Sequence, residues 1–162
     1  MLSNKYTKIL MLSLGLLVSA NVLAQTSDVG ANVEMLHQAV YRRDYERIEA
    51  LLLVGTDINI VGDSLYGHGS PLHVAVQRNY QDIAELLLKH GAVVDLRDLN
   101  DYTPLANAAW NGDLGMVKLL LDAGADINAT NYQGHSPLSC ARDNNKSEVV
   151  KFIEGKLQLI SN

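Results

Sequence analysis

The sequence has few of the residues and motifs that build disulfides, metal sites and catalytic centres. Its 162 residues include one cysteine, Cys140, so the chain cannot form an internal disulfide. It has no H-x-x-x-H pair and no Cys/His cluster, so its five histidines predict no metal site. The glycine patterns of phosphate-binding and dinucleotide-binding loops are missing, and so is G-x-S-x-G. We expect no cofactor and no catalytic residues, and an enzyme stays a third alternative because a fold does not exclude a function.

A hydrophobic run of membrane-spanning length is also missing. The apolar stretch Ile9 to Ala20 is shorter than the about 20 residues that a membrane helix needs. Lys5 and Lys8 precede it, and Val22-Leu23-Ala24 follows with small residues at the positions of a cleavage site. This order predicts a secretory signal peptide over 1–24. Its bacterial style predicts a periplasmic protein, with no membrane association after cleavage and an uncleaved anchor as the alternative.

Positive charge is scarce as well. The chain has 13 Lys and Arg against 18 Asp and Glu, and loss of 1–24 removes two lysines and no acid. The mature chain would therefore carry 11 basic and 18 acidic residues, a net charge of −7. An acidic surface argues against binding to nucleic acid or to anionic membranes. It favours a basic or neutral protein partner.

What the sequence does contain is a period of 33 residues. Its three prolines lie in Ser70-Pro71-Leu72, Thr103-Pro104-Leu105 and Ser136-Pro137-Leu138, each 33 residues after the previous one. Alanine stands three residues after each of these leucines. A weaker copy with Leu36 and Ala39 lies 36 residues before the first, which places an insertion of three residues within 61–69. A fixed period of this length predicts one structural unit stacked on itself, a solenoid with a long concave surface.

Each unit has the signals of two short helices. Proline suits the first turn of a helix, and the Ser or Thr before it can accept hydrogen bonds from the free amides there. A turn with positive φ is expected next, at Asn79, Gly112 and Asn145, whereas Arg43 fits this place poorly and marks a terminal unit. An apolar second helix follows and ends at a glycine. These glycines are Gly55, Gly91 and Gly124.

These units resemble the ankyrin repeat. The resemblance rests on Tyr102-Thr103-Pro104-Leu105, on Met116–Leu121, on Gly124–Asn128 and on matching residues in 70–94, and it covers roughly 32–155. It implies an all-α ankyrin-repeat solenoid of helix-turn-helix units joined by short β-hairpin loops, with about four repeats. The predicted domain covers 32–162 after a linker at 25–31. Its repeats are expected at approximately 32–60, 61–96, 97–129 and 130–157.

Two side chains inside the repeats have structural interpretations. His73 follows Pro-Leu, where ankyrin repeats usually have a structural histidine, and we expect it to hold the start of its own repeat by hydrogen bonds. Cys140 lies in the predicted first helix of the last repeat. It is either a small packing residue or a redox-sensing or intermolecular thiol.

The resemblance also implies where a partner would bind, because ankyrin repeats usually hold partners with their hairpin tips and the exposed end of the first helix. The set is rich in Tyr, Trp and Arg, which dominate interface hot spots. Some of its rings could instead cover neighbouring repeats. The candidate residues are Tyr41, Arg42, Tyr66, Gln77, Arg78, Leu99, Asn100, Tyr102, Trp110, Asn111, Tyr132, Gln133 and His135.

The sequence therefore leaves two functions open, both for a monomeric binding module without cofactor or metal. The first is an adaptor or an assembly or protective factor for another periplasmic protein. The second is an inhibitor or immunity protein that blocks a toxin or an enzyme, which the acidic charge and small size would suit.

Overall fold

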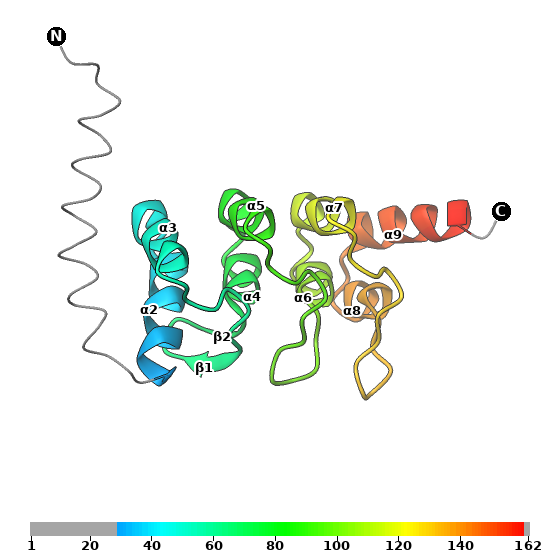
Figure 1. Cartoon of the computed structure of the whole chain (residues 1–162). Helices are drawn as coiled ribbons and strands as arrows, with labels where there is room; N and C mark the ends of the chain where they lie inside the picture. Colours follow the sequence, from blue (N-terminus) through cyan, green and yellow to red (C-terminus); the bar gives the residue numbers. More distant parts are fainter. Residues whose placement is uncertain (1–28, 161–162) are drawn as a thin grey trace, which may run out of the picture.

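The protein is a stack of helix pairs. The computed structural model describes residues 29–160, and within this span eight helices form four consecutive pairs that stand side by side (Figure 1). The first helices of the pairs form one row, and the second helices form another row above it. The predicted signal peptide at 1–24 lies outside the described residues. The pairs are α2 (Val29–Tyr41) with α3 (Tyr45–Leu53), α4 (Pro71–Gln77) with α5 (Gln81–Lys89), α6 (Pro104–Asn111) with α7 (Leu114–Asp122), and α8 (Pro137–Asp143) with α9 (Ser147–Ile160).

The first helices begin where the Pro-Leu motifs predict. Each proline stands in the first turn, and the preceding hydroxyl accepts a hydrogen bond from a backbone N–H three residues ahead. In α6, for example, Thr103 Oγ1 accepts the N–H of Ala106 at 3.3 Å. These caps satisfy amides that would otherwise lack a partner inside the helix.

The second helices end where the glycines predict. In α7 the N–H of Gly124 donates to the carbonyl of Leu121, and the N–H of Ala125 donates to that of Leu120. This pair of bonds is a Schellman motif, which requires a left-handed residue, and Gly124 has φ of 93°. The same pair of bonds closes α3 and α5.

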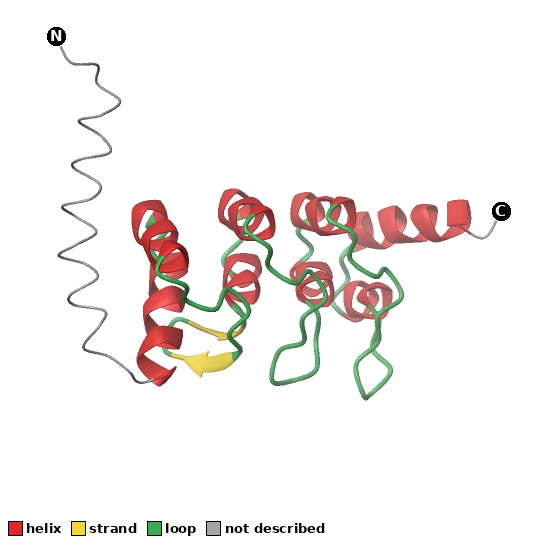
Figure 2. Ribbon diagram, in the orientation of Figure 1, coloured by secondary structure: helices red, strands yellow, loops and turns green. Residues whose placement is uncertain are grey.

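Hairpin loops join the pairs and project below the first-helix row (Figures 1 and 2). The first contains the predicted insertion, and there β1 (Gly62–Ser64) and β2 (Gly67–Gly69) pair antiparallel. The second hairpin is closed by a bond from the Asp98 N–H to the Tyr102 carbonyl, and the third by one from Asn131 to His135. Only the first hairpin forms strands in the described part of the chain.

The two ends of the stack differ from its middle. Helix α2 begins at Val29, so residues 29–31 are helical, whereas we predicted a linker over 25–31. Apolar residues at 29, 33, 36 and 40 continue the helical spacing backwards, and this copy lacks the Pro-Leu start that marks the other first helices. At the other end α9 has 14 residues, while α3, α5 and α7 have nine each.

The core lies between the rows and is shared by neighbouring repeats. The leucine and alanine of each motif are buried, with the exception of the half-buried Leu138. Helix α6 packs against α7 within its repeat and against α4 and α8 of the flanking repeats. Leu105 from α6 and Leu120 from α7 are both fully buried.

Replacing Leu105 or Leu120 with alanine should therefore lower the free energy of unfolding by about 2–5 kcal/mol, because each change leaves a cavity between repeats. Urea unfolding followed by circular dichroism measures the loss. Leu159→Ala, at an exposed position of α9, is the matched control and should change stability little. Unchanged midpoints for both core variants would contradict the assigned register.

Two buried histidines connect successive repeats. His37 Nε2 lies 3.0 Å from the carbonyl oxygen of Gly69, and His73 Nε2 lies 3.1 Å from that of Tyr102. His73 Nδ1 accepts the N–H of Ser70 at 3.1 Å, so the proton is on Nε2, which donates to Tyr102. His73 therefore holds the start of its own repeat, as expected, and also ties it to the next hairpin. Burial lowers the pKa of His73 and keeps the ring neutral.

The lowered pKa of His73 predicts that stability falls in mild acid. The unfolded histidine binds a proton near pH 6.5, whereas the folded ring binds it only at lower pH. The contribution of His73 to the free energy of unfolding is therefore fully present above pH 6.5, and it is lost as the pH falls toward the folded pKa. Urea unfolding at pH 7.5 and at stepwise lower pH should show a smaller pH dependence for His73→Gln than for the unaltered protein. Equal slopes would refute this account.

Candidate functional site

The predicted partner residues on the first helices lie at the same end of each helix. Tyr41 ends α2, Gln77 ends α4, and Trp110 and Asn111 end α6. Arg42 and Arg78 directly follow α2 and α4. The stacking of the repeats thus places this part of the predicted set along one line, next to the hairpins.

An aromatic cluster joins the first two repeats. The guanidinium carbon of Arg78 lies 3.7 Å from the centroid of the Tyr41 ring, a cation–π contact. The Tyr66 ring meets Tyr41 edge-on at 5.4 Å, and its hydroxyl accepts a hydrogen bond of 2.6 Å from Gln38 Nε2. Tyr41 and Tyr66 are half-buried, so part of their surface serves the fold. Arg78 itself is exposed.

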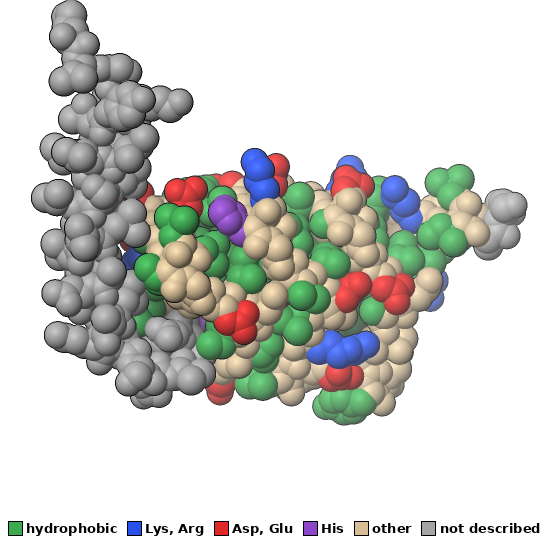
Figure 3. Space-filling model, in the orientation of Figure 1, with side chains coloured by type: hydrophobic (Ala, Val, Ile, Leu, Met, Phe, Trp, Pro, Cys, Tyr) green, Lys and Arg blue, Asp and Glu red, His purple; other side chains and the backbone are tan. Residues whose placement is uncertain are grey.

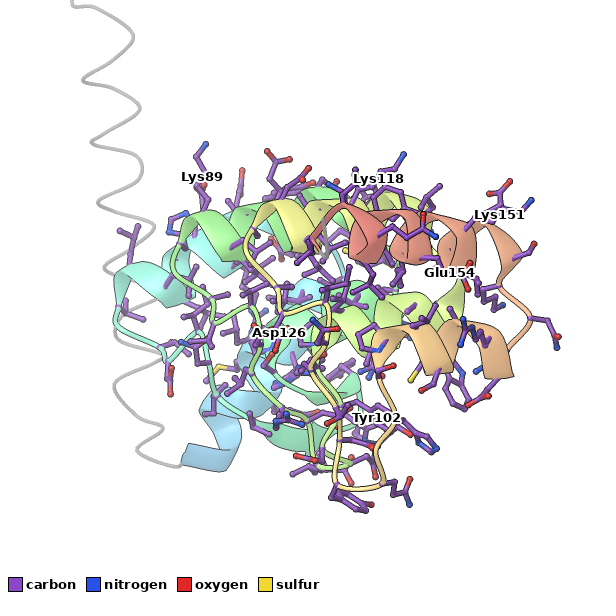
Figure 4. All side chains as sticks on the ribbon, turned by 90° about the vertical axis from the view of Figure 1, so that its right-hand side faces the viewer. Lys89, Tyr102, Lys118, Asp126, Lys151 and Glu154 are labelled. Atoms are coloured by element: carbon purple, nitrogen blue, oxygen red, sulfur yellow. The ribbon has the colours of Figure 1, made fainter. Side chains whose placement is uncertain are left out.

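A second cluster joins the last two hairpins. The rings of Tyr102 and His135 are nearly parallel, with centroids 6.4 Å apart, and the Tyr102 hydroxyl lies 3.2 Å from His135 Nδ1. Figure 4 shows Tyr102 on the hairpin side of the molecule, away from the second-helix row. Burial raises the pKa of the Tyr102 hydroxyl, which stays protonated at neutral pH. Tyr102 and His135 therefore offer a flat, half-buried ring surface.

The hairpin tips carry exposed apolar side chains on ordered loops. In the second hairpin Asp98 Oδ1 accepts the N–H groups of Asn100 and Tyr102, each at 2.9 Å. In the third, Asn131 Oδ1 accepts those of Gln133 and His135 at 3.0 and 2.9 Å. Leu99 and Tyr132 follow these two residues, 33 positions apart, and are 60% and 74% exposed.

Neighbouring tips are also tied to each other. The N–H of Tyr132 donates to Asp101 Oδ2 at 2.6 Å, and Arg97 forms an ion pair with the same carboxylate at 3.3 Å. Asp101 adopts a φ of 65°, where the third hairpin has Gly134. Because aspartate tolerates this left-handed conformation better than most residues, its carboxylate can stand there and bond the next tip.

Trp110 is the large aromatic residue at the end of α6. Its side chain is 49% exposed at the end of α6, while the preceding Ala108 and Ala109 are buried. Arg42, Asn100, Asn111 and Gln133 are exposed as well. The structure thus divides the predicted set into exposed residues and residues that partly pack against a neighbouring repeat.

One contact network was not predicted from the sequence. Arg43, in the turn between α2 and α3, has φ of 54° and pairs with Asp82 of the next repeat. The Tyr45 hydroxyl donates a hydrogen bond to the same carboxylate. The guanidinium carbon of Arg43 lies 5.1 Å from the centroid of the Tyr80 ring. Asp82 lies in the first turn of α5, and the repeat gave no sign that its carboxylate would face Arg43. These bonds explain how a residue that fits the turn poorly is held there.

The described residues hold no arrangement for metal or thiol chemistry. No group of three His, Cys, Asp or Glu side chains comes together within them. Cys140 is buried, and burial with the nearby Asp143 raises the pKa of its thiol to about 11. The thiolate is the reactive form, so this environment favours the packing role over the redox role. Within the same residues, every helix is too short or too polar to cross a bilayer.

Comparison with known proteins agrees with the repeat geometry. A family model described as ankyrin repeats (3 copies) matches residues 36–131. The chain is 37% identical over 120 residues to the B-cell lymphoma 3 protein homolog of Mus musculus, a match that covers 73% of this chain and 27% of that protein. It is 29% identical over 128 residues to an ankyrin repeat protein of fowlpox virus, covering 78% of this chain and 20% of the viral protein.

These relatives are much longer, and the chain spans only about a fifth to a quarter of their length. The similarity therefore concerns the repeats and not the relatives as whole proteins. Ankyrin repeats are in general non-enzymatic modules for protein–protein interaction. Because this family model matches more than half of the chain, the chain belongs to the ankyrin-repeat family.

Proposed function

We propose that the mature protein is a periplasmic binding module that acts as an adaptor, or as an assembly or protective factor, for another exported protein. The observation that carries this proposal is the set of exposed aromatic and apolar side chains at the end of α6 and at the hairpin tips. Trp110, Leu99 and Tyr132 are each at least 49% exposed, although the neighbouring motif residues are buried. Large side chains exposed at repeating positions are typical of interaction sites.

The proposal needs no cofactor, metal or catalytic residue. The chain neighbours of Trp110 and Tyr132 are an alanine and amide side chains, which bind a partner without reacting with it. The mature chain is acidic, so nucleic acid and anionic membranes are poor partners. We expect a monomer that binds one other protein.

An inhibitor or immunity protein is the second candidate function, and the surface charge favours it. A rigid acidic surface can occupy the basic active site of a toxin or an enzyme. A toxin gene beside the gene of this chain would favour this candidate, whereas the gene of a periplasmic enzyme would favour the adaptor.

The signal peptide gives the first functional prediction. Cleavage after Ala24 should produce a mature chain that begins at Gln25. Intact-mass measurement of the protein from a periplasmic fraction checks this expectation. Full-length protein in the cytosol would contradict export, and full-length protein in the membrane fraction would support the uncleaved anchor.

Trp110 gives the second functional prediction. We expect Trp110→Ala to weaken the partner complex by at least about tenfold, because a Trp that becomes buried in an interface is a frequent hot spot. The partner is first captured from periplasmic extract with the mature protein, and the affinity is then measured by calorimetric titration. Thermal melting should change little, since half of the side chain is exposed.

Leu53→Ala is the matched control, since Leu53 is 72% exposed at the end of α3, in the second-helix row. It should leave the affinity unchanged. A large fall in melting temperature of Trp110→Ala with unchanged affinity would assign Trp110 to the core instead.

A further inference from the structure

The negative charge of the protein is concentrated in the hairpin connections. Residues 54–70, 90–103 and 123–136, called here the hairpin edge, contain six aspartates and one arginine, a net charge of −5. The rest of the described chain contains 11 acidic and 10 basic residues, a net charge of −1. The helices are therefore nearly neutral. The aspartates of the hairpin edge are Asp57, Asp63, Asp95, Asp98, Asp101 and Asp126.

Most of this charge is not cancelled inside the protein. Four of the six carboxylates accept hydrogen bonds mainly from neutral backbone N–H groups, as Asp95 does from the N–H of Asp126 at 3.0 Å. Asp101 pairs with Arg97, and Asp63 lies 2.5 Å from His68 Nδ1. The lysines Lys89, Lys118 and Lys151 lie on the second helices, at the opposite edge from Tyr102 (Figure 4). The hairpin edge therefore presents a negative field to solvent.

Exposed apolar side chains stand within this field. Leu65, Leu99 and Tyr132 occupy the tips of three successive hairpins and are 91%, 60% and 74% exposed. Hydrophobic side chains are visible at the lower ends of the hairpins in the space-filling view (Figure 3). A single exposed leucine needs no explanation, but one at each tip forms a row that the stacking of the repeats keeps in line.

The tips are also preorganised. The bonds from Asp98 and Asn131 to the loop amides fix the second and third hairpins, and the β1–β2 pairing fixes the first. The bond from Tyr132 to Asp101 ties the last two tips together. A surface that is ordered before binding loses little conformational entropy when a partner arrives.

From this juxtaposition we propose that the hairpin edge docks a positively charged protein segment that carries apolar side chains between its Lys and Arg residues. The segment's apolar side chains cover Leu65, Leu99 and Tyr132, and its cations face the surrounding aspartates. The sign of the charge favours this occupant over an anionic lipid surface or a nucleic acid. The inference rests on the proposed function and adds the chemical class of the partner.

A selection from a random peptide library tests this inference on the mature protein, residues 25–162. The enriched peptides should be net positive and should contain apolar residues. A triple variant should bind the selected peptide at least about tenfold more weakly, because it removes the apolar row. Its changes are Leu65→Ser, Leu99→Ser and Tyr132→Ser. Leu159→Ser with Ile160→Ser is the matched control, because both side chains are exposed at the end of α9, and it should leave binding unchanged.

A charge series tests the electrostatic part separately. A second triple variant carries Asp57→Asn, Asp63→Asn and Asp126→Asn. Its affinity for the peptide should be about tenfold lower at low salt, and this difference should disappear at high salt because salt screens exposed charges. Asparagine keeps an oxygen that can accept the loop hydrogen bonds. Glu46→Gln, Asp122→Asn and Glu148→Gln remove as many exposed charges from the second helices and should have no such effect.

The outcomes separate this inference from the proposed function. The inference would be overturned if the enriched peptides were acidic or uncharged. It would also be overturned if both hairpin variants bound the peptide as tightly as the unaltered protein. If such binding is still lost in Trp110→Ala, the module binds a partner but not at the hairpin edge. A selection without any binder also overturns the docking of a linear segment, and the proposed function then depends on the captured partner alone.

Discussion

Every other feature of this structure depends on the burial of apolar side chains between neighbouring repeats. A single helix pair leaves one face of its leucines and alanines exposed, and only the next pair covers it. Leu105 is fully buried because α6 has α4 on one side and α8 on the other. The 33-residue period follows from this constraint, since each repeat must present the same apolar faces at the same height. The histidine bonds from His37 and His73 to the next repeat then fix the spacing that packing alone would leave adjustable.

The sequence contained most of the fold because the repeat encodes it locally. The proline at the first turn, the hydroxyl before it and the glycine after the second helix each act within a few residues, and all three were placed correctly. The start of α2 at Val29 was missed because this copy lacks the Ser/Thr-Pro-Leu motif that marks the start of the other first helices. The pairing of Arg43 with Asp82 was missed because it joins side chains of two repeats, and the period fixes positions rather than partners.

The candidate site was less predictable than the fold for the same reason. Spacing placed Tyr41 and Trp110 at the ends of their helices and Tyr102 in a hairpin, but it did not reveal which rings would pack. In the structure Tyr41 supports Arg78 and Tyr102 stacks on His135, whereas half of Trp110 faces solvent. Whether a ring packs on a neighbour depends on the side chains one repeat away, which a motif within one repeat does not specify. The binding role of these residues remains the proposal argued above.

The stack also explains why recognition chemistry can gather at the hairpins without loss of stability. The shared core consists mainly of helix side chains, and the connections add residues such as Ala125 and Ile127 that lie before the tips. The tips themselves therefore contribute little to the core and can carry exposed apolar side chains and carboxylates. The loops have their own local support, since Asp98 and Asn131 satisfy the tip amides that no strand pairs. Asp101 shows that this arrangement has a cost, because it holds a left-handed conformation where the next repeat has glycine. That conformation places its carboxylate against the following tip, so the same residue orders two hairpins and adds to the charge of their edge.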